Sequence, residues 1–258
     1  MRLKEILARY DREQRFEMEE PGMRREASPT VVRQVNQHGQ QSCLLYSNLS
    51  TANIDGVIDE QISYFRSLGH SFEWKVFAHD PMPDLKERLA ARGFELEETE
   101  AVLVLDLETL PVALAKPVLH DVRRITEPAA LADVSVVKQA VWGEDTTGRV
   151  ERLARELREQ PERTRIYVAY ENGTPASAGW LTWDTGKQFA GLWGGSTIAA
   201  FRKRGFYTAL VAVRAQEARR SGARFLTVDA RPMSRPILER LGFEVLTFAN
   251  ALHWRPRV

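Results

Sequence analysis

The sequence has almost no cysteine: Cys43 is the single one among 258 residues. One cysteine cannot form an intrachain disulfide, which excludes a small secreted scaffold held by disulfides. A reducing compartment, the cytoplasm, is therefore the expected location. Neither Cys43 nor the five histidines show the spacing of metal ligands, so we expect no metal site.

Long apolar runs and an excess of either charge are also missing. No stretch approaches the roughly 18–20 apolar residues of a membrane helix. Residues 1–20 carry charges throughout, unlike the apolar centre of a signal peptide. The 36 Lys and Arg against 35 Asp and Glu leave a net charge of +1, which gives no general attraction to nucleic acid or to an anionic membrane. An apolar content of 43% together with this small net charge excludes a disordered chain.

The apolar patterns divide the chain into two halves. Residues 108–120 contain two prolines and no long period, which is typical of a linker. We therefore predict one domain over residues 1–110, with a leading helix, and a second over residues 120–258. Each half contains a glycine, a strand, a proline-containing loop, a short helix and then Gly-Phe-Glu, ending at residues 95 and 244. The matching order favours an internal duplication, and independent helix-ending glycines are the alternative.

A basic loop, Phe201-Arg202-Lys203-Arg204-Gly205-Phe206-Tyr207, lies between a predicted strand and the long helix predicted for residues 206–221. The first turn of a helix leaves about four N–H groups unpaired and carries partial positive charge. Three cations add charge there, and the glycine allows close approach of the backbone, as a pyrophosphate site requires. A solvated basic turn that caps the helix is the alternative.

Residues 120–254 resemble the GNAT superfamily of N-acetyltransferases. The resemblance rests on the order of elements, on Arg202-x-x-Gly205 and on the run SRPILERLGFEVL at residues 234–246. It implies an α+β fold, with a mixed, mostly antiparallel central sheet flanked by helices, repeated in tandem. Two positions depart from the family pattern: Tyr207 replaces a small residue, and Lys203 stands where a second glycine is frequent.

The resemblance implies acetyl-CoA as the co-substrate. The residues expected to hold it are Ser196, Thr197, Ile198, Arg202, Lys203, Arg204, Gly205, Phe206 and Tyr207. Gly194 and Gly195 fit an opening in the sheet that admits the thioester, or an ordinary bulge. The N-terminal half has no cations at the matching position, Ala52, so we expect it to shape the acceptor pocket without binding CoA.

The family's usual proton donor, a tyrosine, falls on Leu238, which cannot donate a proton. Ser234 and Tyr207 are the remaining candidate donors, and Ser234 also fits a helix N-cap. The candidate bases are Glu144, Asp145, Asp184 and Asp229, although a solvated carboxylate is the common reading of each. An amine that arrives deprotonated needs no base. The catalytic prediction is Ser234, Tyr207 and Asp229.

Tryptophans concentrate on the central strands of the second half, at Trp180, Trp183 and Trp193. An exposed ring attracts a cation, although core packing is the common use of such residues. The predicted substrate-binding residues are Glu144, Asp145, Trp183 and Trp193.

Together these features predict an N-acetyltransferase that moves an acetyl group to a primary amine by direct attack in a ternary complex. A non-catalytic acyl-CoA-binding or sensor protein is the alternative, because Leu238 replaces the tyrosine. A nucleic-acid-binding module using residues 202–204 and 219–220 is a third, which the balanced charge disfavours. The sequence specifies neither the acceptor, a small molecule or a peptide, nor the oligomeric state.

Overall fold

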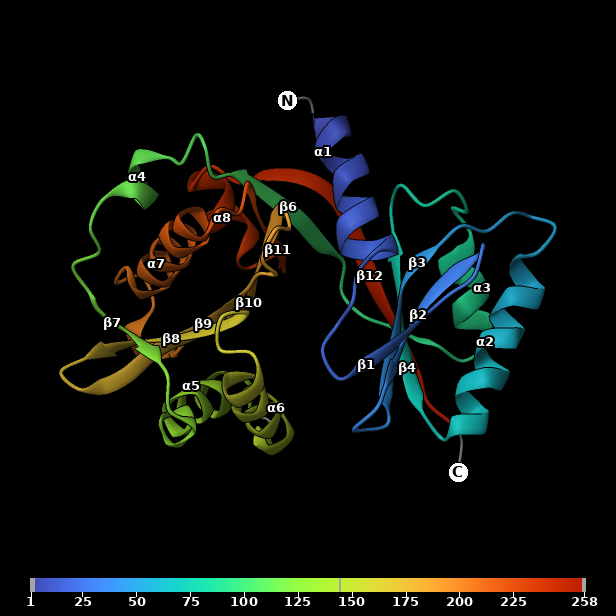
Figure 1. The fold of residues 1–258 in the computed structure, drawn as a ribbon, viewed down its shortest axis with the longest axis horizontal. Coiled ribbons are helices and arrows are strands. Elements are labelled where there is room, and N and C mark those ends of the chain that lie inside the picture. Colours follow the sequence, from blue (N-terminus) through green and yellow to red (C-terminus); the bar gives the residue numbers. More distant parts are fainter. Residues whose placement is uncertain (1–2, 144, 257–258) are drawn as a thin grey trace. The chain divides into compact units, whose positions relative to one another are not determined.

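The structure, a computed structural model, describes residues 3–143 and 145–256 and contains two compact units, which are described separately (Figure 1). Unit 1 consists of residues 1–102, 230–236 and 245–258, and unit 2 of residues 103–229 and 237–244. The units therefore do not follow the predicted boundaries around residues 108–120. The last strand of the chain lies mostly in unit 1, and the end of the last strand of the N-terminal half lies in unit 2.

Unit 1 has a sheet in the order β1-β2-β3-β4-β12, with β5 also pairing with β12. Its strands are β1 (Met23–Ala27), β2 (Val31–Asn36), β3 (Gln41–Ser47), β4 (Ser71–Phe77), β5 (Glu95–Leu96) and β12 (Glu244–Trp254). Its helices are α1 (Leu3–Tyr10), the π-helix η1 (Asp11–Phe16), α2 (Ile54–Leu68) and α3 (Leu85–Ala91). The β3–β4 pair is parallel, and β12 pairs antiparallel with β4.

Helix α2 forms because its apolar residues recur at helical spacing and Gly69 ends it with a φ of 68°. Its buried face includes Phe65, which stacks on Phe72 of β4 with ring centroids 4.3 Å apart. The fully buried Trp74 belongs to the same core.

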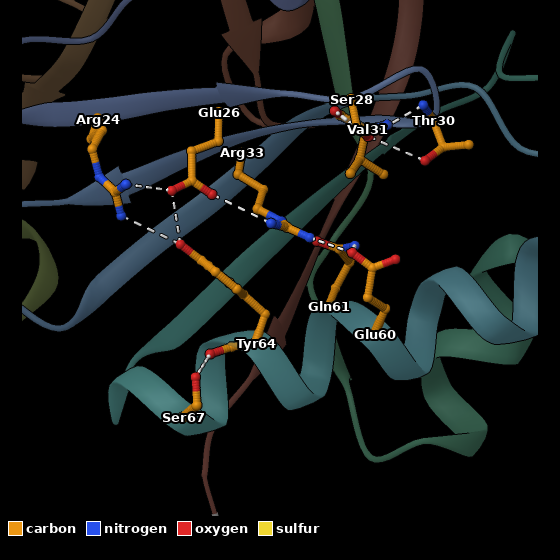
Figure 2. A network of polar contacts seen from close by, with 10 residues as sticks. All are labelled: Arg24, Glu26, Ser28, Thr30, Val31, Arg33, Glu60, Gln61, Tyr64 and Ser67. Atoms are coloured by element: carbon orange, nitrogen blue, oxygen red, sulfur yellow. Dashed lines mark hydrogen bonds and ion pairs between the residues drawn. The ribbon is translucent and has the colours of Figure 1, made fainter.

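A polar network joins α2 to strands β1 and β2 (Figure 2). Arg33 of β2 donates from Nε to Oε1 of Gln61 and from Nη2 to Oε1 of Glu60, both at 2.6 Å. Its guanidinium lies 4.1 Å from the ring centroid of Tyr64, whose hydroxyl donates to Glu26 at 2.9 Å. The network is internally satisfied around Arg33, so we assign it a structural role.

Unit 2 has a sheet in the order β11-β10-β9-β8-β7. Its strands are β7 (Asp121–Ile125), β8 (Thr164–Glu171), β9 (Thr174–Thr182), β10 (Phe189–Thr197) and β11 (Phe225–Ala230). The end of β6 (Glu100–Asp106) follows β11 in the strand order, where the amide of Leu107 donates to the carbonyl of Arg224 at 3.0 Å. The β10–β11 pair is parallel, whereas the β7–β8, β8–β9 and β9–β10 pairs are antiparallel.

The helical segments of this half of the chain are α4 (Val112–Ala115), η2 (Pro128–Ala130), α5 (Leu131–Trp142), α6 (Thr147–Glu159), η3 (Ala199–Phe201), α7 (Phe206–Ser221) and α8 (Arg235–Arg240). They cover both faces of the sheet of unit 2 (Figure 1). Ile166 and Val168 of β8 pack with the core under α5 and α6, whereas Tyr167 and Ala169 pack with the core under α7. This alternation is the period of a strand buried on both faces.

The same order of elements occurs in both halves of the chain, with β3-α2-β4-α3 in the first and β10-α7-β11-α8 in the second. Gly93 and Gly242 follow the short helices with φ values of 85° and 95°, and each precedes a buried phenylalanine, Phe94 or Phe243. The predicted α+β fold class, mostly antiparallel and in two related halves, is confirmed.

Among the described residues, no helix combines the length and the apolarity needed to cross a membrane.

Candidate functional site

Strand β10 is interrupted by a bulge in the middle of unit 2. Its register against β9 shifts between the pairs Trp193–Trp180 and Ser196–Ala178. Gly194 has a φ of 60°, and a Cβ on it would lie 2.1 Å from the ring of Trp180. Only glycine fits there, because any side chain would collide with the indole and strain the backbone.

The neighbouring strands β10 and β11 separate just before this bulge. They pair from Phe189–Phe225 to Gly191–Thr227, while β10 continues to Thr197 and β11 to Ala230. The predicted splay between these strands is therefore present, next to the glycine pair. Asp229, a predicted catalytic residue, lies on β11 two residues beyond the last pair and is half-buried.

The predicted basic loop connects β10 to α7. Lys203 and Gly205 both have left-handed backbones, with φ values of 62° and 86°, and Gly205 is the N-cap residue directly before α7. His120 donates from Nε2 to the carbonyl of Arg204 at 2.9 Å, and a Cβ on Gly205 would lie 3.0 Å from its ring. The loop is thus a formed turn in which glycine is required, and it leads into the N-terminus of a 16-residue helix.

The three cations of the loop are exposed but differ in their contacts. Arg202 donates from Nε to the carbonyl of Thr197 at 3.2 Å, and Arg204 forms an ion pair with Glu171. The amide of Arg202 also donates to the carbonyl of Ala199 at 3.2 Å. We therefore expect an anion to meet main-chain amides from Lys203 onward.

Tyr207 and Arg214 of α7 lie beneath the bulge. A Cβ on Gly195 would lie 3.0 Å from Cε2 and 3.7 Å from the hydroxyl of Tyr207, and 3.8 Å from Nη2 of Arg214. Gly195 itself is exposed and Tyr207 is half-buried. The structure thus brings the predicted donor Tyr207 to the bulge and the splay.

Sequence reasoning missed Arg214, which is 1% exposed. It donates from Nη1 to the carbonyls of Trp180 and Trp193, at 3.1 and 3.3 Å, and from Nε to the carbonyl of Leu210. Burial lowers the pKa of Arg214 to about 10, although Tyr207 and Tyr167 act in the opposite direction.

Lys138 of α5 was missed as well. It is 2% exposed and donates to the carbonyl of Gly194 and, at 2.9 Å, to the hydroxyl of Ser196. The indole of Trp142 donates to the same hydroxyl at 3.1 Å. The available signal was a charged residue within a helical run of apolar ones: Lys138 follows Val134 and Val137, and Arg214 lies between Leu210 and Ala218.

The other predicted residues are more dispersed. Ser234 falls in unit 1, and its hydroxyl donates to the carbonyl of Arg231 at 3.1 Å. Trp183 is buried, and its indole donates to the carbonyl of Lys187, whereas Trp193 is 43% exposed and donates to Thr182. Asp184 pairs with Arg163 at 2.8 Å.

Asp145 is exposed and accepts from the amide and hydroxyl of Thr147, which lowers the pKa of its carboxyl. Glu144 lies outside the described residues. Within the described ranges, no three His, Cys, Asp or Glu side chains gather in a way that would hold a metal ion.

The sequence of this half matches a known family. Residues 132–243 match the family described as "Acetyltransferase (GNAT) family". That stretch includes the bulge, the splay, the basic loop and α7. No curated protein matches the sequence.

Solved structures match nearly the whole chain. A GCN5-related N-acetyltransferase from Kribbella flavida has a TM-score of 0.69 at 14% identity, covering 92% of this chain and 91% of its own. A conserved protein of unknown function from Staphylococcus epidermidis ATCC 12228 has a TM-score of 0.69 at 12% identity, covering 94% and 98%. A tandem GNAT protein from the clavulanic acid biosynthesis pathway has a TM-score of 0.61 at 14% identity, covering 94% and 86%.

Identities this low establish the fold alone. The predicted resemblance is confirmed: the C-terminal half of the chain carries a GNAT acetyltransferase-family region, and the chain as a whole has the fold of a tandem GNAT protein.

Proposed function

We propose that this protein transfers the acetyl group of acetyl-CoA to a primary amine by direct attack in a ternary complex. The observation that carries the proposal is one arrangement within unit 2: a bulged, splayed strand pair that leads through a basic loop into a helix N-terminus. In this reaction the amine nitrogen forms a bond to the acetyl carbon, the C–S bond breaks with its electron pair on sulfur, and the proton lost by nitrogen ends on the thiol product.

The fit to CoA rests on the loop. Lys203 and Gly205 turn the backbone so that the helix N-terminus lies beside exposed positive charge, which suits a pyrophosphate. Residues 203–207 would supply main-chain amides, and Arg202, Lys203 and Arg204 the charge. Ser196, Thr197 and Ile198 would line the thioester arm along the splayed part of β10.

Tyr207 is the best-placed proton donor for the departing thiol. Its hydroxyl lies beside the exposed backbone of Gly195, whereas Leu238 is fully buried and has no proton to give. Ser234 is the weaker candidate because it donates to a carbonyl in its own turn and belongs to unit 1. Asp229, at the edge of the splay, is the carboxylate we assign as base.

Trp193 is the residue we assign to the acceptor. Its ring is 43% exposed on the strand that bulges, and an aromatic face attracts an alkylammonium ion. Trp183 is less suited to this role because its ring is buried, and Asp145 because its carboxylate accepts two hydrogen bonds from Thr147.

A non-catalytic acyl-CoA-binding protein is the competing function, favoured by the buried Leu238. Release of free thiol from acetyl-CoA, followed against a panel of amines, separates the two. Turnover with at least one amine supports transfer. Tight acetyl-CoA binding without turnover on any amine supports the competing function.

The loop assignment is tested by Gly205→Glu. The Cβ of the new side chain would meet the ring of His120, and its carboxylate would repel the pyrophosphate. The affinity for acetyl-CoA should therefore fall by about a hundredfold, which corresponds to roughly 3 kcal/mol. Calorimetric titration with acetyl-CoA measures it.

Gly222→Glu is the matched control. It lies at the other end of the same helix, also at positive φ, with no atom within 4 Å of the new Cβ. Equal affinity losses in the two variants would refute the loop assignment.

A further inference from the structure

The β10 bulge is held from both faces of the sheet by buried cations. Lys138, from α5, bonds to the carbonyl of Gly194 and the hydroxyl of Ser196. Arg214, from α7, bonds to the carbonyls of Trp193 and, across the strand pair, Trp180. Taking a cation out of water costs several kcal/mol, so two of them at one bulge call for an explanation beyond packing.

Unit 1 has a corresponding bulge on β3, and there the buried cation is paired with carboxylates. The β2–β3 register shifts at Leu45, and the carbonyl of Leu45 accepts from Nε of Arg15 at 2.9 Å. Arg15, which is 2% exposed, is neutralised by Asp11 at 2.8 Å and Asp80 at 2.7 Å. The half without a basic loop therefore supplies the countercharge for its bulge cation from its own carboxylates.

Arg214 differs from Arg15 in this respect. Among the described residues, the hydrogen bonds of its guanidinium run to main-chain carbonyls, which carry dipoles but no formal charge. Gly179 and Gly195 leave room for it: a Cβ on Gly179 would lie 2.8 Å from Nη1. Gly195, which is exposed, lies next to this positive charge: a Cβ on it would be 3.8 Å from Nη2 of Arg214.

We infer that Arg214, assisted by Lys138, is a positioning residue whose positive charge stabilises the CoA thiolate formed at the β10 bulge when the acetyl group leaves. This inference rests on the proposed function. The C–S bond breaks with its electron pair on sulfur, and the thiolate then takes a proton from Tyr207, which recovers one from the acetylated nitrogen. Stabilising the thiolate before its protonation reduces the need for a strong acid, which would allow transfer with leucine at position 238.

Other charged and titratable groups face the same region. Arg152 of α6 lies over the ring of Trp180. Tyr167 of β8 and Tyr207 of α7 interact electrostatically with Arg214. Asp229 of β11 lies beyond the last β10–β11 pair. A pH effect must therefore be assigned by substitution and not from the profile alone.

The test compares the affinities of CoA and desulfo-CoA, which lacks the thiol, by calorimetry across pH 6–9. If Arg214 stabilises the thiolate, the thiol pKa falls on binding. The affinity for CoA relative to that for desulfo-CoA should then rise as pH increases from the bound to the free thiol pKa, by about tenfold for each unit of that fall. We call this rise the CoA gain. Arg214→Met should abolish this gain, Arg214→Lys should retain most of it, and Lys138→Met should reduce it.

Arg165→Met is the matched control. Arg165 is another buried arginine of unit 2, bonded to Ser221 and Glu217 at the far end of α7. Its loss should leave the pH-dependent rise in affinity for CoA over desulfo-CoA unchanged. Thermal unfolding of each variant verifies the fold. If Arg214→Met does not fold, Arg214→Lys and Lys138→Met decide the matter.

An equal CoA gain in wild type, Arg214→Met and Lys138→Met, or no gain in wild type, overturns the inference. The readout needs no acceptor, so its outcome is separate from that of the proposed function. Absence of turnover on every amine would count against transfer, while the CoA gain would still report the charge at the bulge.

Discussion

At the scale of single residues, the candidate site depends on what glycine leaves uncovered. Gly194 has no side chain because Trp180 fills that space, and Gly195 has none because Tyr207 does. The result is an exposed stretch of backbone with a phenol directly beneath it. Tyr207 stands where the family pattern has a small residue, and in the structure its ring lies against the bulge at Gly195.

Tyr207→Phe tests the assignment of Tyr207 as the proton donor. Losing the hydroxyl should lower kcat by about 10²–10⁴-fold, because that is the usual contribution of a positioned proton donor. Acetyl-CoA affinity should stay within about threefold, since the ring that packs on Gly195 is kept. Steady-state kinetics and calorimetry measure the two effects. A greater loss of kcat in Ser234→Ala than in Tyr207→Phe would move the role to Ser234.

At the scale of elements, ion pairs of Asp11 and Arg15 hold the π-helix η1 of unit 1 in place. Asp11 accepts from His79 at 2.9 Å and from Arg15 at 2.8 Å, and the other ring nitrogen of His79 is 2.8 Å from the hydroxyl of Thr247. Burial raises the pKa of Asp11, but the hydrogen bonds from His79 and Arg15 outweigh it and leave the pKa below its ordinary value.

This predicts a pH-dependent stability. A lowered native pKa means that the ionised carboxylate stabilises the fold above its unfolded pKa of about 4, and that the contribution is lost as pH falls through the native value. Asp11→Ala should cost about 1–2 kcal/mol at pH 7, because Arg15 keeps Asp80. Urea unfolding at pH 7 and pH 3 measures the cost, which should shrink at the lower pH. A constant difference would contradict the assignment.

Elements differ in how far sequence patterns predicted them. The long helix predicted for residues 206–221 is observed as α7 with the same bounds, because burial of one face imposes a helical period on the residues. The strands β1 (MRREA) and β7 (DVRRI) were missed, because most of their residues are charged and Ile125 alone among them is buried. Their main chains form strands by pairing with β2 and β8, which no local pattern records.

At the scale of the whole molecule, the two halves of the sequence are not the two compact units. Residues 245–254 of β12 belong to unit 1, where they pair with β4, and residues 103–106 of β6 belong to unit 2. Each half of the chain therefore lacks a strand that its sheet uses.

A divided chain tests this arrangement. Residues 120–258 expressed alone should aggregate or lack a cooperative thermal transition, because β12 loses β4 and the sheet of unit 2 loses β6. Co-expression with residues 1–119 should restore a cooperative transition, followed by circular dichroism. A cooperative transition in residues 120–258 alone would show that the predicted domain boundaries suffice for folding.

The sequence by itself determined the local features of this protein: the helix and strand periods, the repeated order of elements, the basic loop at a helix start and the absence of a tyrosine at position 238. Each depends on neighbouring residues, so a local pattern carries it. Only the tertiary structure decided with which sheet β12 pairs. It alone also brought Lys138 and Arg214 to the carbonyls of a single bulge. An apolar period records that a face is buried, but not against which partner, and a buried charge is recognised only when the groups around it are in place.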